Sequence, residues 1–179
     1  MSKSTLRTLV VLLPLAAFAA LPARAQSATP TPAPAPPPCS AAEFRQFDFW
    51  LGDWEVEAGG KLAGHNRITR LYGDCILREE YRTANGAYVG TSLNGYDAAR
   101  KVWHQTWVDN QGLVLLLDGR FEKGAMRLEG KSPTAGGERI DRITWTPNPD
   151  GSVRQHWEQS TDGGKSWKSA FDGLYRKKK

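Results

Sequence analysis

From Gly52 onward, apolar and polar residues alternate along the chain with a period of two. In the first such segment, Trp54 and Val56 are separated by acidic residues. Successive side chains of a β-strand point to opposite faces, so this pattern predicts strands with one buried face. Further strands are predicted near 61–72, 75–83, 87–97, 101–108, 112–120, 125–132, 138–146, 152–160 and 166–176.

Tight turns separate these segments. Glycine, asparagine and aspartate gather between them, for example at Gly59-Gly60 and Asn85-Gly86, and these residues favour hairpin turns. Ten short strands joined in this way predict an antiparallel meander, and closing the meander into a barrel removes its unpaired edges. We therefore expect an all-β fold, a roughly ten-stranded antiparallel barrel.

The stretch before the first strand is the most aromatic part of the chain and reads FRQFDFWLGDWEV. Its apolar residues recur at helical spacing as far as Leu51. Ser40-Ala41-Ala42-Glu43 has the form of a capping box, in which the serine hydroxyl accepts a bond from the backbone of the glutamate. A helix this short is marginal alone. We expect it to plug one open end of the barrel and to run into the first strand at Gly52.

The first 25 residues have the features of a secretory signal peptide. Lys3 and Arg7 give a positive start, residues 9–21 are apolar, and Ala23-Arg24-Ala25 is a small-x-small cleavage site. The apolar run is short for a membrane span, and an uncleaved anchor is the alternative. We expect a periplasmic or secreted protein.

After the predicted signal peptide, the composition indicates a linker, one domain and a tail. Residues 26–38 are rich in threonine, proline and alanine, which predicts an extended spacer. One barrel domain is predicted over 39–176, and a basic tail over 177–179.

The net charge of +5 comes from the two ends of the chain. Three positive residues lie in the predicted signal peptide and four in Arg176 to Lys179, which leaves about −2 for the remainder. A nucleic-acid binder needs basic residues gathered on its folded surface, so we expect no nucleic-acid partner. Beyond the predicted signal peptide no stretch is apolar enough to span a membrane. We expect a monomer or a dimer.

Cys39 and Cys75 are the only cysteines. In an oxidising compartment a single disulfide between them is the favoured interpretation, and two free buried thiols are the alternative. Closing a loop of this length contributes about 3–4 kcal/mol of stability. The bridge would hold the predicted helix over the barrel.

The strand parity places aromatic residues on inward faces. Trp103, Gln105 and Trp107 share one face, Val153, Gln155 and Trp157 a second, and Trp167, Phe171 and Tyr175 a third. Polar residues accompany them, and on the same reasoning Glu79, Ser92 and Asn94 join Gln105 and Gln155.

A barrel of this size is either filled by side chains or holds one small ligand. Large aromatic residues with a few polar groups are the usual lining of a ligand site. Both possibilities stay open at this point. The predicted ligand-binding residues are Trp54, Glu79, Tyr81, Gln105, Trp107, Gln155 and Trp157.

Catalytic and metal-binding patterns do not occur in the sequence. His65, His104 and His156 form no spaced pair with a cysteine or carboxylate, so we expect no metal site. There is no Gly-x-Ser-x-Gly motif and no glycine loop of the kind that cradles phosphate. An enzyme is therefore the less favoured class, with Glu79 as its candidate acid.

Residues 160–167, STDGGKSW, resemble the Asp-box, a hairpin of the form S-x-D-x-G-x-[ST]-W that recurs in β-propellers. A propeller repeats its motif, and this chain holds a single copy. The motif therefore indicates a structural turn, in which Asp162 bonds the turn backbone and Trp167 packs beneath it.

Several segments together resemble a large bacterial family of exported domains of unknown function, associated with the lipocalin-like (calycin) barrels. The resemblance covers residues 43–176 and implies a calycin-type barrel, but it carries over no catalytic residue. The segments are FDFWLGDW, GKLAGHNRITRLYGDC, WHQTWVDNQG, RITWTPNPDG and VRQHWEQSTDGGKSWKSAFDGLYR.

Nitrobindins, a neighbouring calycin group, bind haem through a histidine in a ten-stranded barrel. Gly52-Asp53-Trp54 resembles their start, but they continue with glycines where this chain has Glu55 to Ala58. His156 is the histidine placed late enough in the chain to compare with their ligand. By parity it faces away from Trp157 and thus outward, so we expect no cofactor, with haem as the alternative.

Taken together, these patterns favour an exported barrel that binds a small apolar or amphipathic molecule. A haem-binding nitrobindin-like barrel, and a filled barrel with a structural or interaction role, are the alternatives.

Overall fold

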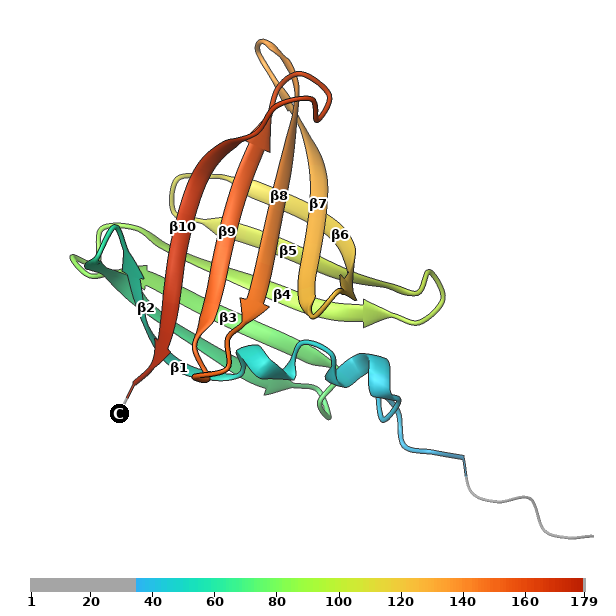
Figure 1. The fold of residues 1–179 in the computed structure, drawn as a ribbon. Helices are drawn as coiled ribbons and strands as arrows, with labels where there is room; N and C mark the ends of the chain where they lie inside the picture. The colour runs from blue at the N-terminus through green and yellow to red at the C-terminus, as the bar shows by residue number, and fades with distance from the viewer. Residues whose placement is uncertain (1–34, 179) are drawn as a thin grey trace, which may run out of the picture. The chain divides into compact units, whose positions relative to one another are not determined.

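The structure is a computed structural model that describes residues 35–178. The predicted signal peptide and residues 26–34 of the predicted linker lie outside this range. Ten antiparallel strands close a barrel in the order β1-β10-β9-β8-β7-β6-β5-β4-β3-β2, which confirms the predicted fold (Figure 1). The strands are β1 (Gly52–Ala58), β2 (Lys61–Leu71), β3 (Ile76–Thr83), β4 (Val89–Asp97), β5 (Val102–Asp109), β6 (Val114–Glu122), β7 (Ala125–Thr134), β8 (Gly137–Pro147), β9 (Val153–Ser160) and β10 (Lys168–Lys177).

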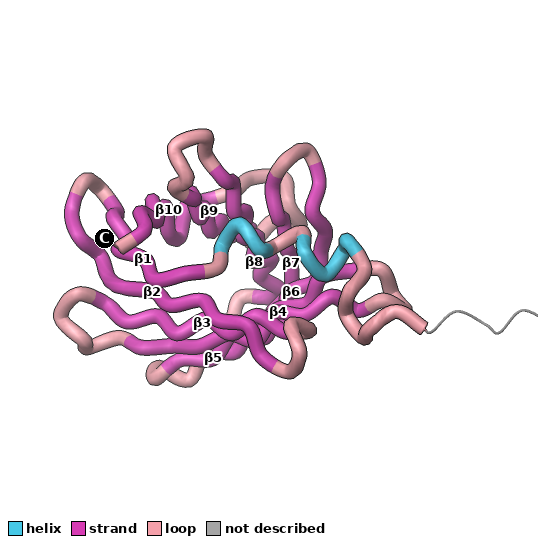
Figure 2. The backbone as a smooth tube through the Cα atoms, turned by 90° about the horizontal axis from the view of Figure 1, so that it is seen from below, coloured by secondary structure: helices cyan, strands magenta, loops and turns pink. Residues whose placement is uncertain are grey.

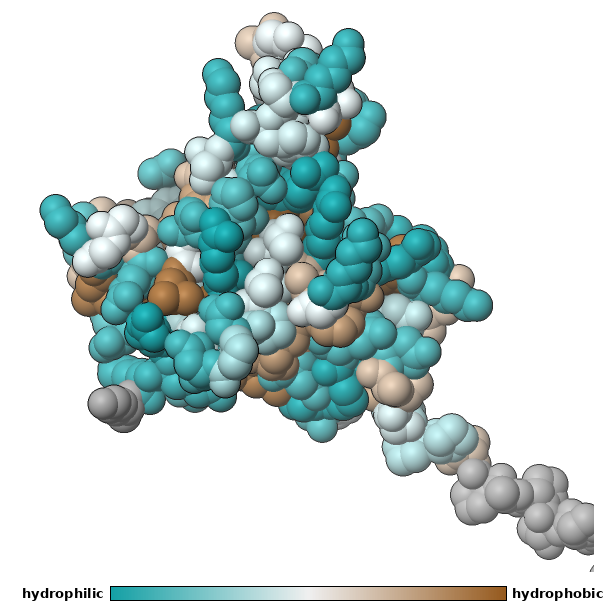
Figure 3. Space-filling model, viewed as in Figure 1, coloured by the Kyte–Doolittle hydropathy of each residue, from teal (hydrophilic) through white to brown (hydrophobic). Residues whose placement is uncertain are grey.

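Alternating burial along each strand follows the sequence pattern. In β1, Trp54 and Val56 are buried while Asp53 and Glu55 are exposed. The outward positions are mostly polar, and the face seen in Figure 3 is accordingly largely hydrophilic. Among residues 35–178, no helix has the length and apolar character that crossing a membrane requires.

Two short 3₁₀ helices precede the barrel, η1 (Ala42–Arg45) and η2 (Asp48–Trp50). Figure 2 shows them crossing one end of the barrel, as expected of a plug. The predicted capping box is wrong. Ala41, in extended conformation, is the N-cap of η1, and no side chain caps that helix. Ser40 therefore lies one residue too early to reach the first turn.

Covalent and polar contacts fix this plug to the barrel. Cys39 and Cys75 form a disulfide, as predicted. Asp48 pairs with Arg70 of β2 at 2.6 Å. From β5, the indole Nε1 of Trp103 donates to Gln46 Oε1 at 3.2 Å. These contacts hold η1 and η2 across the barrel end.

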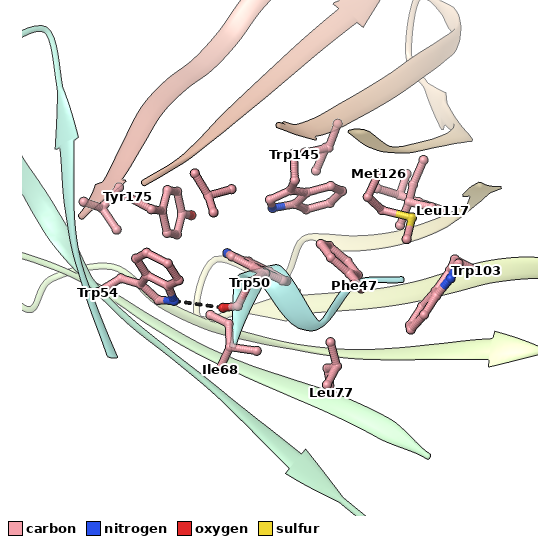
Figure 4. Close-up of a cluster of buried hydrophobic side chains, with 14 of the residues drawn as sticks. Phe47, Trp50, Trp54, Ile68, Leu77, Trp103, Leu117, Met126, Trp145 and Tyr175 are labelled. Atoms are coloured by element: carbon pink, nitrogen blue, oxygen red, sulfur yellow. Dashed lines mark hydrogen bonds between the residues drawn. The ribbon is translucent and has the colours of Figure 1, made fainter. Parts of the chain in front are cut away.

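Aromatic rings from the plug fill the adjacent half of the barrel interior (Figure 4). Phe47 stacks on Trp50 with ring centroids 4.9 Å apart and meets Trp145 edge-on at 5.2 Å. Trp54 donates its indole N–H to the carbonyl of Trp50 at 2.9 Å. Aromatic contacts of this kind contribute beyond the area that they bury. This half of the barrel is a packed core.

The last strand departs from the predicted parity. The register of β10 against β9 shifts between Ser169 and Phe171, so one residue bulges there. A bulge changes the face on which preceding side chains lie. Trp167 consequently does not share the inward face of Phe171 and Tyr175 as predicted. It lies before β10, under the guanidinium of Arg142.

The predicted boundary between barrel and basic tail also differs. β10 continues to Lys177, whose ammonium lies 5.2 Å from the Trp54 ring centroid. The backbone N–H of Lys178 donates to the carbonyl of Asp53 at 2.9 Å. The first two tail residues therefore belong to the fold, while Lys179 lies outside the described residues.

Candidate functional site

The half of the barrel away from the plug contains a cavity of about 350 Å³. Thr83 and Tyr88, which flank the β3–β4 connection, lie in its wall. β1 starts at the plug and β3 runs in the same sense, so this connection lies at the opposite end of the barrel. The full lining is Ala63, Glu79, Tyr81, Thr83, Tyr88, Gln105, Trp107, Leu115, Ile143, Gln155, Trp157, Ala170, Phe171 and Tyr175.

Seven buried polar side chains from six strands form a continuous hydrogen-bonded row that runs around the interior from β9 to β5. We call this set the polar row. In bonding order it consists of Gln155, Tyr175, Asn66, Glu79, Ser92, Asn94 and Gln105. Mutual bonding makes it possible to bury so many polar groups, because a buried polar group left unpaired costs about 1–3 kcal/mol.

Glu79 is the ionisable group at the centre of the polar row. Its Oε1 accepts from Asn66 Nδ2 at 2.6 Å, and its Oε2 accepts from Ser92 Oγ at 2.6 Å. Burial raises the pKa of Glu79 to about 7, against the lowering effect of these two bonds. Among the residues that line the cavity there is no lysine, arginine or histidine to offset its charge.

Five aromatic residues, the aromatic wall, enclose the cavity beside the polar row. They are Tyr81, Tyr88, Trp107, Trp157 and Phe171. The ring centroids of Tyr81 and Tyr88 are 6.2 Å apart, and those of Tyr88 and Trp107 are 6.4 Å apart. These rings give the cavity a largely apolar lining on this side.

Two aspartates hold the tryptophans of the aromatic wall in place. Asp109 Oδ2 accepts from Trp107 Nε1 at 3.2 Å and from the hydroxyl of Tyr88 at 2.7 Å. Asp141 Oδ1 accepts from Trp157 Nε1 at 2.9 Å. The polar atoms of these three rings are thus engaged by the protein, and their apolar surfaces face the cavity.

The structure brings most of the predicted site residues together. Glu79, Tyr81, Gln105, Trp107, Gln155 and Trp157 all line the cavity. Trp54 faces inward as predicted, but it packs at the plugged end and does not line the cavity. Parity gives the face on which a side chain lies, not its depth along the barrel.

Sequence reasoning did not assign several cavity residues. Phe171 and Tyr175 lie on the inward face that parity predicts, but the bulge that brings Ala170 into the lining with them has no signal in the sequence. Tyr88 lies just before β4 but within the strand predicted near 87–97, where it has the parity of the inward residues Ser92 and Asn94, and this signal would have found it. Asn66 belongs to the polar row and does not line the cavity; it has the parity of an inward residue on β2, and this signal would have found it.

His156 lies on the outer face, as parity predicts. Its Nε2 is 3.2 Å from Ser169 Oγ, and its Nδ1 is 3.8 Å from Glu158 Oε2. Its side chain is 28% exposed and does not line the cavity. Binding of a cofactor inside the barrel through this imidazole would need a different strand register.

The Asp-box hairpin has the predicted turn geometry. Asp162 Oδ1 accepts from the backbone of Ser166 at 2.9 Å, and Oδ2 accepts from its hydroxyl at 2.6 Å. These bonds, with one from Ser160, hold the pKa of Asp162 below its usual range. The hairpin therefore orders the β9–β10 connection.

Comparison of the sequence with protein-family models finds no match, and no curated protein matches it. The likenesses to exported calycin-like domains and to nitrobindins therefore stay predictions. The geometry of the cavity, with its polar row and its aromatic wall, is the basis for inferring a function.

Proposed function

We propose that this chain is an exported barrel that binds one small amphipathic molecule in its cavity. The observation that carries the proposal is the unfilled space of about 350 Å³ between the polar row and the aromatic wall. Ligand sites are typically concave, mostly apolar and furnished with a few polar groups that fix orientation. The volume lies at the lower end of the range for such sites, which favours a compact ligand over a long-chain lipid.

The arrangement also argues against a barrel filled throughout by side chains. The plug fills one half, where Phe47 and Trp50 are fully buried. In the other half, Asp109 and Asp141 bind the indole N–H groups of Trp107 and Trp157 and so keep these large side chains from filling the space. The cavity is thus maintained by specific contacts.

Export is supported by the disulfide and by the predicted signal peptide. Disulfides persist in oxidising compartments and are rare in reducing ones. The Cys39–Cys75 bridge fastens the plug that closes one end of the binding barrel. In this proposal the same compartment supplies the ligand and keeps its binding site intact.

A flat ligand fits the two surfaces of the cavity. Its apolar body would lie against Trp107 and Trp157, where burying apolar surface contributes about 25 cal/mol per Å². Its polar group would point to the polar row, near Glu79 and Gln155. An amphipathic molecule satisfies both requirements, whereas a wholly apolar one leaves the polar row without a partner.

Isothermal titration calorimetry with a naphthoquinone, a flavone and a medium-chain fatty acid tests the proposal. We expect saturable, equimolar binding of at least one compound. Trp107→Ala and Gln155→Leu should each weaken it by about tenfold, because one removes apolar contact and the other a polar partner. The matched control is Trp54→Phe, a buried tryptophan outside the cavity, which should change the affinity by less than about twofold.

The result that overturns the proposal is the absence of saturable binding by these compounds and by a flat aromatic amine, or binding that both cavity variants leave unchanged. Mass spectrometry of the recovered ligand gives a further check. An unmodified ligand supports a binding protein. Conversion of the ligand, lost in Glu79→Gln, would instead assign the cavity to an enzyme in which Glu79 acts as acid or base.

A further inference from the structure

The charge inside the cavity is of one sign. Glu79 is the only acidic residue in the lining, and no lysine, arginine or histidine lines the same space. Two arginines close to Glu79, Arg78 on the same strand and Arg67 on β2, point the other way. Arg67 pairs with Asp53, and Arg78 pairs with Glu80, on the outer surface. An anionic ligand would therefore be buried beside a carboxyl group without a counter-charge.

The polar row also has spare acceptors. An ionised carboxylate offers about four acceptor sites, and Asn66 and Ser92 occupy one on each oxygen of Glu79. Beside it, Asn66 Oδ1 is buried and accepts no hydrogen bond within residues 35–178. Asn66 does not itself line the cavity, so the remaining acceptor sites of Glu79 are the ones that suit a ligand that donates.

The aromatic wall fits the same kind of ligand. The faces of tryptophan and tyrosine rings attract cations. The indole N–H groups of Trp107 and Trp157 are bound by aspartates, and the amide nitrogen of Gln105 donates to Asn94. These three donors are therefore engaged within the protein, while the amide nitrogen of Gln155, whose oxygen accepts from Tyr175, stays in the lining as an uncharged donor.

Resting on the proposed function, we propose that the ligand is an amine whose ammonium group pairs with the Glu79 carboxylate while its flat hydrocarbon body packs on the aromatic wall. The ammonium supplies the positive charge that the cavity lacks and hydrogen-bond donors for its free acceptors. Carboxylates and other anions of the same shape are excluded by the charge of Glu79.

This pairing has a defined pH dependence. The groups facing Glu79 are Tyr81 on its own strand, Tyr175 from β10, Tyr88 from the β3–β4 connection, and the uncharged Asn66, Ser92, Asn94 and Gln105. Burial raises the pKa of all three tyrosines, so they stay neutral. Glu79 is the group that titrates near pH 7. Amine binding should therefore strengthen as pH rises from about 5.5 to about 8.

Three probes with one skeleton test the charge preference by calorimetry on the mature chain: naphthylmethylamine, naphthylmethanol and naphthoate. At about pH 8 we expect the amine to bind about tenfold more tightly than the alcohol, and the carboxylate to bind weakest. At about pH 5.5, where Glu79 is protonated, the advantage of the amine over the alcohol should fall to about twofold.

Glu79→Gln and Glu80→Gln form a matched pair of variants. They change neighbouring residues of β3, one facing the cavity and one facing solvent beside Arg78. In Glu79→Gln, the affinities for the amine and for the alcohol should differ by no more than about twofold at both pH values, and the alcohol should still bind. Glu80→Gln should leave the order and its pH dependence unchanged. Thermal melts confirm that both variants are folded.

The possible failures are distinguishable. Binding of the three probes with equal affinity, or tightest binding of naphthoate, overturns the charge preference and leaves the proposed function standing. An amine preference that persists in Glu79→Gln also overturns it, since another group would then be responsible. Absence of saturable binding by any probe overturns the amine proposal and counts against the binding function itself.

Discussion

Replacing Glu79 by glutamine should remove a stability penalty that the native protein carries above neutral pH. Burial raises the pKa of Glu79 from 4.5 to about 7 in the folded state, since the charged form has lost its water and gained no cation. At 1.36 kcal/mol per pH unit of pKa difference, the folded protein loses about 3 kcal/mol from this group. Relative to high pH, the preference of folded Glu79 for its proton stabilises the protein fully below about pH 4.5. This stabilisation is lost as pH rises through 7.

The measurement is urea unfolding followed by circular dichroism, at several values from about pH 4.5 to about pH 8.5. The quantity of interest is the difference in unfolding free energy between Glu79→Gln and the native protein. Glutamine changes the bonds to Asn66 and Ser92, and this offset is independent of pH. The difference should therefore move by about 3 kcal/mol in favour of the variant across the range.

Glu80→Gln is the control, because Glu80 is 48% exposed and pairs with Arg78 at 2.9 Å on the outer face. Such exposed pairs contribute about 0–1 kcal/mol, so its difference from the native protein should stay nearly flat. A Glu79→Gln difference that is equally flat, within about 0.5 kcal/mol, would refute the reasoning. It would mean that Glu79 is hydrated or charge-compensated when folded.

Two further predictions concern the disulfide and His156. Replacing Cys39 and Cys75 together by serine should lower the unfolding free energy by about 4 kcal/mol, because their sequence separation is 36 residues, and leave the barrel folded. Alkylation of two thiols in unreduced, exported protein would contradict the bridge. Titration with haem should give no Soret shift that depends on His156, whose imidazole contacts Glu158 and Ser169 on the outer face. A stoichiometric shift abolished in His156→Ala would contradict this.

Most of the barrel could be predicted from the sequence because its interior is buried on one face of every strand. Period-two alternation and turn residues locate the strands to within a few residues. The plug was harder to predict. Its two 3₁₀ helices are too short for periodicity to define their type, and Ser40 precedes the N-cap that the structure adopts. The prediction of the disulfide beside it depended on the expected oxidising compartment and not on the pattern of apolar and polar residues.

The sequence predicts which side chains of the candidate site face inward, but it does not predict how much space is left between them. Parity places Gln105 and Gln155 inward, and both line the cavity. Parity could not show that the plug occupies the space beside Trp54, since that depends on how far Trp50 reaches into the barrel. It also fails at the β10 bulge before Phe171, where one extra residue changes the face.

The aspartates that hold the cavity tryptophans affect more than the shape of the site. Because Asp109 and Asp141 bind the indole N–H groups of Trp107 and Trp157, these rings are already restrained before a ligand arrives. A ligand that docks against them causes little further loss of side-chain conformational entropy. The same rigidity narrows the range of shapes that the site admits. The barrel should therefore discriminate among ligands by outline, and a ring system slightly too wide should fail to bind rather than bind weakly.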